Sequence, residues 1–145
     1  MASDPSLAIQ GSAYAVLTGA PFQSACGVAT GVWDEVPANA AYPYVSIEDL
    51  QTTPNQAVGF DGSEVVLTAH VWSRKTGSVE AKRIADAVRD ALAPVPGSAP
   101  PFSLAARGHV LIGWLAGGSR MLRDPNDPLA KHIPVRLIYQ TQPAP

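Results

Sequence analysis

The segment Glu64-Val-Val-Leu-Thr-Ala-His-Val-Trp-Ser73, with the residues at 79–93 that follow it, decides the fold class. Its side chains alternate between two faces, and both faces are largely apolar. One face carries Val65, Leu67, Ala69 and Val71, and the other carries Val66, Thr68, His70 and Trp72. A run rich in β-branched and aromatic residues with this alternation is typical of a strand. Because both faces need cover, we predict a central strand at 64–73.

Residues 79–93 have the periodicity of an amphipathic helix. The apolar positions recur every three or four residues and form one stripe: Ala81, Ile84, Ala85, Val88 and Leu92. Charged residues occupy most of the other positions, and Ser78 stands where a helix N-cap is expected. This segment is predicted to be a helix that packs on the sheet.

The rest of the chain reads as short elements separated by many of its 14 prolines and 12 glycines. Working outward, we expect a helix at 4–18, strands at 31–36 and 43–50, a long loop or hairpin arm at 51–63, a proline-rich link at 94–101, a strand at 108–116, a strand or connection at 119–123, a turn at 124–128, and a strand at 133–141. Runs of strands with only two helices indicate the α+β class. We predict a single domain over 1–145, a mostly antiparallel sheet with two helices packed on it.

Two details of the last strand follow from its composition. Pro134 lacks a backbone N–H, so we expect this strand to lie at a sheet edge or the proline to lie at the strand's start. The terminal residues 142–145 include two more prolines and are expected to fray.

The composition excludes several classes of protein. Apolar residues make up 46% and charged residues 15% of the chain, which excludes a disordered, charge-dominated chain. No stretch approaches the roughly 20 apolar residues that cross a bilayer, and the N-terminus does not resemble a signal peptide. The 10 basic residues are outnumbered by 12 acidic ones, so generic DNA affinity should be weak. We expect a soluble, cytosolic product with no membrane partner.

The common catalytic motifs are absent from the sequence. It contains no nucleophile elbow, no glycine-rich phosphate loop and no zinc-binding helix. Cys26 is the single cysteine, which excludes an internal disulfide and a thiolate zinc site. His70, His109 and His132 are far apart in the sequence, and structural or surface roles are favoured over a metal site. We therefore predict no catalytic, cofactor or metal site, and no cofactor.

The C-terminal third is the one region with uneven charge. Its basic residues outnumber Asp124 and Asp127: Arg107, Arg120, Arg123, Lys131 and Arg136. This is either a solvated face or a contact with another subunit or partner. The three tryptophans, Trp33, Trp72 and Trp114, lie on separate predicted strands, where core packing is the default and at most one is an interface anchor. A domain with edge strands, a long arm and no visible active site is more easily explained as a subunit of an assembly than as an enzyme.

The order of several segments resembles the tail-completion proteins of long-tailed phages. The resemblance runs over roughly 7–139 and rests on Val32-Trp-Asp-Glu-Val-Pro37, Tyr42-Pro-Tyr-Val45, Leu67-Thr-Ala-His-Val-Trp-Ser-Arg74, Glu80-Ala-Lys-Arg-Ile-Ala-Asp-Ala-Val88, Gly108-His109 and Arg120-Met-Leu-Arg-Asp124. That family includes tail terminators and tail-to-head joining proteins, with relatives in prophages and gene-transfer agents. The proline-heavy link at 94–101 and the turn at 124–128 depart from its pattern.

The resemblance implies a structural virion protein, assembled in the host cytoplasm. Such a subunit would form a homo-hexameric ring at the head-proximal end of the tail, end polymerisation of the tail tube protein and join a head connector or stopper protein. DNA would pass the lumen without specific binding, which the near-neutral charge balance suits.

Assembly contacts are expected at residues that the resemblance covers and that flank strands, and in the arm. These are Arg74, Arg120, Arg123 and Asp124, with Pro54 and Phe60 in the arm at 51–63. Two other functions stay open. One is a head-side connector or stopper. The other, more remote, is a small ligand-binding domain or enzyme that uses His70 near Trp72.

Overall fold

β3 (Phe60–Ser73) is the middle strand of the sheet in the computed structural model, which describes residues 4–145. Five strands follow the order β1-β2-β3-β6-β4, and β5 pairs with β6. Only β1 and β2 are parallel, and every other pair is antiparallel. The central position of β3 and the mostly antiparallel sheet are therefore confirmed. The elements around β3 are α1 (Ser6–Leu17), α2 (Ala20–Cys26), β1 (Gly31–Trp33), β2 (Tyr44–Ala57), α3 (Val79–Leu92), a 3-10 turn (Ala105–Arg107), β4 (His109–Ser119), β5 (Leu122–Asp124) and β6 (Asp127–Pro143).

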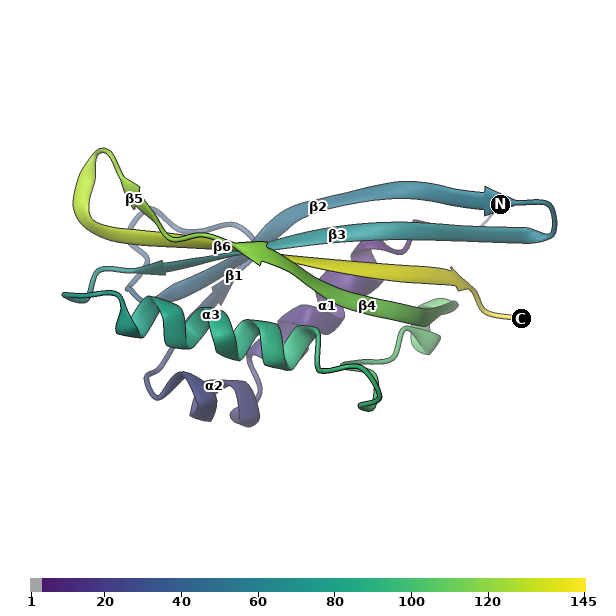
Figure 1. Ribbon diagram of the computed structural model, residues 1–145, viewed down its shortest axis with the longest axis horizontal. Coiled ribbons are helices and arrows are strands. Elements are labelled where there is room, and N and C mark those ends of the chain that lie inside the picture. The colour runs from purple at the N-terminus through teal and green to yellow at the C-terminus, as the bar shows by residue number, and fades with distance from the viewer. Residues whose placement is uncertain (1–3) are drawn as a thin grey trace.

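The molecule has two layers, a long sheet and a layer of helices on one of its faces (Figure 1). Between them lies the core, to which β3 and β6 contribute alternate residues. Those with no exposed surface include Val65, Leu67, Val71, Val135 and Leu137. α3 presents its predicted apolar stripe to them, and Ile84, Val88 and Leu92 are fully buried. Full burial of each such side chain stabilises the folded state by about 1.5–3 kcal/mol. The α+β class is thus confirmed.

The C-terminal end of α3 is tied to the sheet by one buried hydrogen bond. The hydroxyl of Tyr139 on β6 donates to the carbonyl oxygen of Leu92 at 2.6 Å. The last carbonyls of a helix have no partner within the helix, so this bond satisfies a group that would otherwise be buried alone. Burial raises the pKa of Tyr139, which keeps its hydroxyl protonated and able to donate.

A third helix, α2, was not predicted. Pro21 indicated a break, but it lies in the first turn of α2, where the missing N–H has no intrahelical partner to lose. Gly27 ends the helix in the left-handed region at φ 73°, which a glycine adopts at little cost. Cys26, expected in a loop, is the last residue of this helix and is buried. Burial raises the pKa of its thiol, so the thiolate is disfavoured.

The predictions for the last strand were wrong. β6 is an interior strand between β3 and β4. Pro134 is tolerated because it lies where the strand on one side of β6 changes from β5 to β4. His132 pairs with Leu122 of β5, and Val135 pairs with Ser119 of β4. Of the terminal residues, Gln142 pairs with Val110, and the N–H of Ala144 donates to the carbonyl of Gly108 at 2.8 Å.

Residues 51–63 form the far part of the long β2–β3 hairpin. The two strands pair as far as Ala57 and Phe60, which leaves a two-residue turn. Gly59 in this turn has φ 78°, and Val58 is fully exposed. Pairing of β3 with β6 begins only at Ser63, so the hairpin projects beyond its neighbour as a two-stranded ribbon. Figure 1 shows this tip at the opposite end of the sheet from β5.

Candidate assembly surface

The face of the sheet opposite the helices, here called the outer face, carries a row of aromatic rings at one end. Tyr44, Trp72 and His132 are direct register partners on β2, β3 and β6. Their rings follow one another across the strands: Tyr44 and Trp72 stack with centroids 6.4 Å apart, and Trp72 and His132 with centroids 4.2 Å apart and 2° between planes. Cross-strand pairs of this kind stabilise a sheet by tenths of a kcal/mol to about 1 kcal/mol each.

The row continues beyond the ends of β2 and β3. Tyr42 packs against Tyr44 with centroids 5.1 Å apart, and the guanidinium carbon of Arg74 lies 5.7 Å from the Tyr42 ring centre. Arg74 also forms an ion pair with Asp127, Nε to Oδ2 at 2.9 Å. Burial, and then the neighbouring Tyr42, raise the pKa of Tyr44 to about 12. Tyr44 is therefore an uncharged packing residue at any ordinary pH.

His132 also contacts a second histidine on the same face. Its Nε2 lies 2.6 Å from Nδ1 of His70, and Nε2 of His70 lies 3.2 Å from Oδ2 of Asp49. Burial and the neighbouring His70 lower the pKa of His132. His109 is elsewhere, buried at the start of β4. Two histidines that are 62 residues apart in sequence are thus brought together by the β3–β6 register.

Beside the aromatic row lies a hollow of about 610 Å³, here called the arginine pocket. Its lining combines the stacked rings with the residues before and within β5: Trp72, Arg120, Met121, Leu122, Arg123, Asp124, Pro125 and His132. Arg123 has one long hydrogen bond, from Nη1 to the carbonyl of Pro128 at 3.5 Å. The structure therefore brings together three of the predicted contact residues, Arg120, Arg123 and Asp124.

The six predicted contact residues form two groups rather than one. Arg74 lies at the same end of the sheet as the arginine pocket, through its ion pair with Asp127 at the start of β6. Pro54 and Phe60 lie in the hairpin ribbon at the other end (Figure 1). Trp72 lies twelve residue steps after Phe60 on β3, which corresponds to about 40 Å at roughly 3.3 Å per residue.

The residues that sequence reasoning missed are the aromatic partners of the arginines. Trp72 was expected by default in the core, but it lies partly exposed on the outer face and lines the arginine pocket. Trp114 does pack on the core, and its indole N–H donates to the carbonyl of Pro94 at 3.0 Å. The sequence feature that indicates the outer face for Trp72 is the alternation within 64–73, which places Trp72 on the face opposite Val65 and Leu67.

Both edges of the sheet offer backbone groups for pairing. β1 covers only Tyr44–Ser46 of β2, so within residues 4–145 no strand lies beside β2 from Asp49 to Ala57 on that side. The opposite edge is β4, which likewise has no strand on its far side in the described chain. Ile112 and Leu115 on β4 are about half exposed, at 48% and 55%. Open edges of this kind are templates for another strand.

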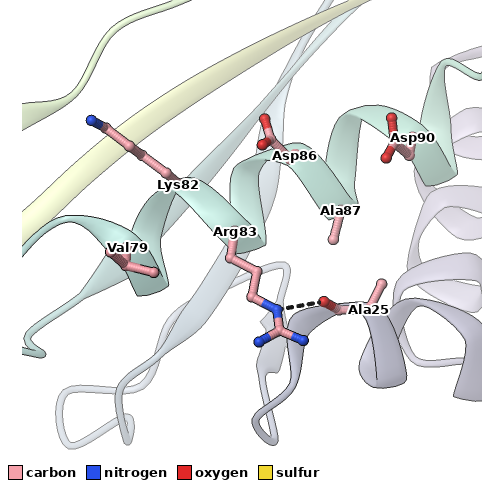
Figure 2. A pocket seen from close by; sticks show the side chains of 7 residues that line it. All are labelled: Ala25, Val79, Lys82, Arg83, Asp86, Ala87 and Asp90. Carbon is pink, nitrogen blue, oxygen red and sulfur yellow. Dashed lines mark hydrogen bonds between the residues drawn. The ribbon is translucent and has the colours of Figure 1, made fainter.

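A second hollow, of about 470 Å³, lies over α3 and carries charges of both signs. Figure 2 shows Arg83 reaching from α3 toward α2, where its Nε donates to the carbonyl of Ala25 at 3.1 Å. Lys82, Asp86 and Asp90 point to the other side of the helix in this view. Arg83 thus joins two helices, and the mixed charges favour no particular ligand.

Two features of residues 4–145 bear on other functions. No group of three or more His, Cys, Asp or Glu side chains is placed to hold a metal ion there. No helix in that part of the chain is long and apolar enough to span a membrane.

Both a family model and solved structures match this chain. The family model described as "Tail completion protein gp17" matches residues 14–139. A solved chain in "Virion of native gene transfer agent (GTA) particle" superposes with a TM-score of 0.70 at 23% identity, covering 92% of this chain and 93% of that one. At that identity the likeness shows a shared fold. No curated protein sequence matches the chain.

Proposed function

Because the chain belongs to the gp17 family of tail completion proteins, which are structural proteins of phage tails, we propose that it forms a closed ring at the head-proximal end of a tail tube. In this position it ends polymerisation of the tube protein and joins the tail to a head connector. The six-fold number of the ring rests on the family resemblance. No catalysis is needed for this role, and DNA passes the lumen without specific binding.

The observation that carries the ring proposal is the pair of open edges. β2, β3, β6 and β4 alternate in direction, so β2 and β4 run antiparallel to each other at the two edges. β4 of one subunit can therefore pair with β2 of the next and continue the antiparallel alternation. Such a contact joins two different surfaces, and it closes into a ring if the rotation between subunits allows it. Open edges on both sides are what a repeating contact requires.

The two groups of predicted contact residues support a role between two partners. The hairpin tip and β5 lie at opposite ends of the long strands (Figure 1), and residues of β5 line the arginine pocket. If the strands run along the ring axis, one group faces the tube and the other faces the head. We assign the hairpin tip, with Pro54 and Phe60, to the tube, because a projecting ribbon can reach past the ring. The pocket, with Arg120, Arg123 and Asp124, is then left for the connector.

Lysines on the β4 edge test the ring directly. The double variant I112K/L115K places two charges on half-exposed positions of the edge and should block pairing between subunits while leaving the subunit folded. The matched control is V79K, which changes a more exposed valine at the start of α3, away from both edges. Native mass spectrometry with the tube protein as template should show rings for the control and free subunits for the edge variant. Rings of unchanged mass in the edge variant would contradict the proposed contact.

A further inference from the structure

The contact between His70 and His132 has a chemical property that the assembly role does not use. The cluster joins three neighbouring strands: Asp49 on β2, His70 on β3 and His132 on β6. It lies on the outer face, where His70 keeps 24% of its side chain exposed. Protons from solvent therefore reach the cluster, although His132 is partly buried beneath Trp72.

The 2.6 Å between His70 Nδ1 and His132 Nε2 leaves room for one hydrogen atom. When both rings are neutral, one nitrogen donates and the other accepts. When the pair takes up one proton, a single N–H still lies between the rings, so the contact persists. When both rings are imidazolium, all four ring nitrogens carry hydrogen, and two N–H groups face each other. The contact is therefore compatible with no or one added proton, but not with two.

The surroundings of the pair disfavour a charge on His132. The carboxylate of Asp49 faces His70 Nε2 at 3.2 Å and can balance a charge on that ring. The ring of His132 stacks on Trp72, and burial, followed by the neighbouring His70, lowers the pKa of His132. Among the other charged groups near the pair, Asp124 raises the pKa of His132, as the third cause after burial and His70. Arg120 and Arg123 line the pocket with His132, and Arg136 is the register partner of Thr68.

We propose that His70 and His132 form a proton-operated latch on the outer face. The latch holds β2, β3 and β6 together while the pair carries no or one added proton, and it opens when both rings are protonated. His132 and Trp72 also line the arginine pocket, so opening in mild acid changes the lining of that pocket. The latch is a property of one subunit and does not depend on the proposed ring.

Histidine NMR across a pH titration tests the latch. In the labelled native chain, the ring signals of His132 should move in two steps, and the second step should coincide with a shift of the Trp72 indole signals. In H70Q, His132 should titrate in one step, with a midpoint higher by about half a pH unit or more, because the neighbouring charge is gone. T68V, on the same strand and face but outside the pair, is the control and should keep both steps. A single His132 step with the same midpoint in the native chain and in H70Q would overturn the proposal.

Unfolding at a series of pH values gives a second, independent readout. Unfolded His132 takes up its proton near pH 6.5, whereas the folded chain does so at lower pH. The free energy of unfolding should therefore fall as the pH drops below 6.5, because the unfolded state then binds more protons. H132Q should remove that part of the pH dependence. An equally steep fall in H132Q would show that other groups cause the acid sensitivity, and it would contradict the latch.

Discussion

Trp72 on β3 and His132 on β6 stand directly opposite each other, and their rings are nearly parallel with centroids 4.2 Å apart. This stack forms one wall of the arginine pocket, so two guanidinium groups are presented beside a rigid aromatic surface. Aromatic and arginine side chains are the residue types that most often dominate the binding energy of an interface. The pocket is accordingly where we expect substitutions to affect assembly more than folding.

Replacement of Arg120 and Arg123 by alanine should separate assembly from stability. Surface changes of this kind shift the free energy of unfolding by about 0.5 kcal/mol or less. Binding to the partner should weaken by about tenfold or more, since alanine at an interface hot spot costs about 2 kcal/mol or more and about 1.4 kcal/mol corresponds to a tenfold change. Thermal melting and a pull-down with connector proteins measure the two effects.

The matched control for this pair is Arg83→Ala. Arg83 joins α3 to α2 through the Ala25 carbonyl, so its loss should lower the melting temperature and leave partner binding unchanged. If R120A/R123A instead lowered the melting temperature and spared binding, the two arginines would be fold residues.

Tyr139→Phe tests the bond that fixes the end of α3. The variant leaves the Leu92 carbonyl buried without its partner, which should cost about 1–3 kcal/mol. Urea unfolding measures the loss, and Tyr14→Phe, at a tyrosine that is 48% exposed, is the control with no expected change. A stability of Y139F equal to that of the control would mean that the bond does not stabilise the fold.

Shortening the hairpin tests the arm. Thr53 and Glu64 are register partners, so an Asn-Gly turn can join them in place of residues 54–63. The subunit should fold, because most of the core lies outside the ribbon, but it should no longer cap tubes. Tube length in electron micrographs is the readout. Normal capping by the shortened chain would show that Pro54 and Phe60 make no necessary contact.

The sequence predicted those features of the fold that depend on local periodicity. The strand at β3 and the helix at α3 each carry an unbroken pattern of two or 3.6 residues, and both were found where expected. α2 was missed because Pro21 breaks a helix in its interior but is tolerated in its first turn. The position of Pro134 was misjudged because the change of partner from β4 to β5 depends on strands elsewhere in the chain.

The candidate surface was predictable only in part, for a related reason. Arg120, Arg123 and Asp124 are close in sequence, so their proximity in space follows easily. Their contacts with Trp72 and His132 depend on the β3–β6 register, which pairs residues about 60 positions apart. No local pattern determines that register, so neither the aromatic row nor the histidine pair could be derived from the sequence.

The most direct test of the central claim is to delete the gene from its parent element and measure tail lengths by electron microscopy. A protein that ends tube polymerisation should leave, on deletion, headless tails of uncontrolled and excessive length. Complementation with the native chain should restore uniform tails joined to heads, whereas the edge variant I112K/L115K should not. Tails of normal, uniform length in the deletion strain would contradict the terminator role and indicate a function on the head side.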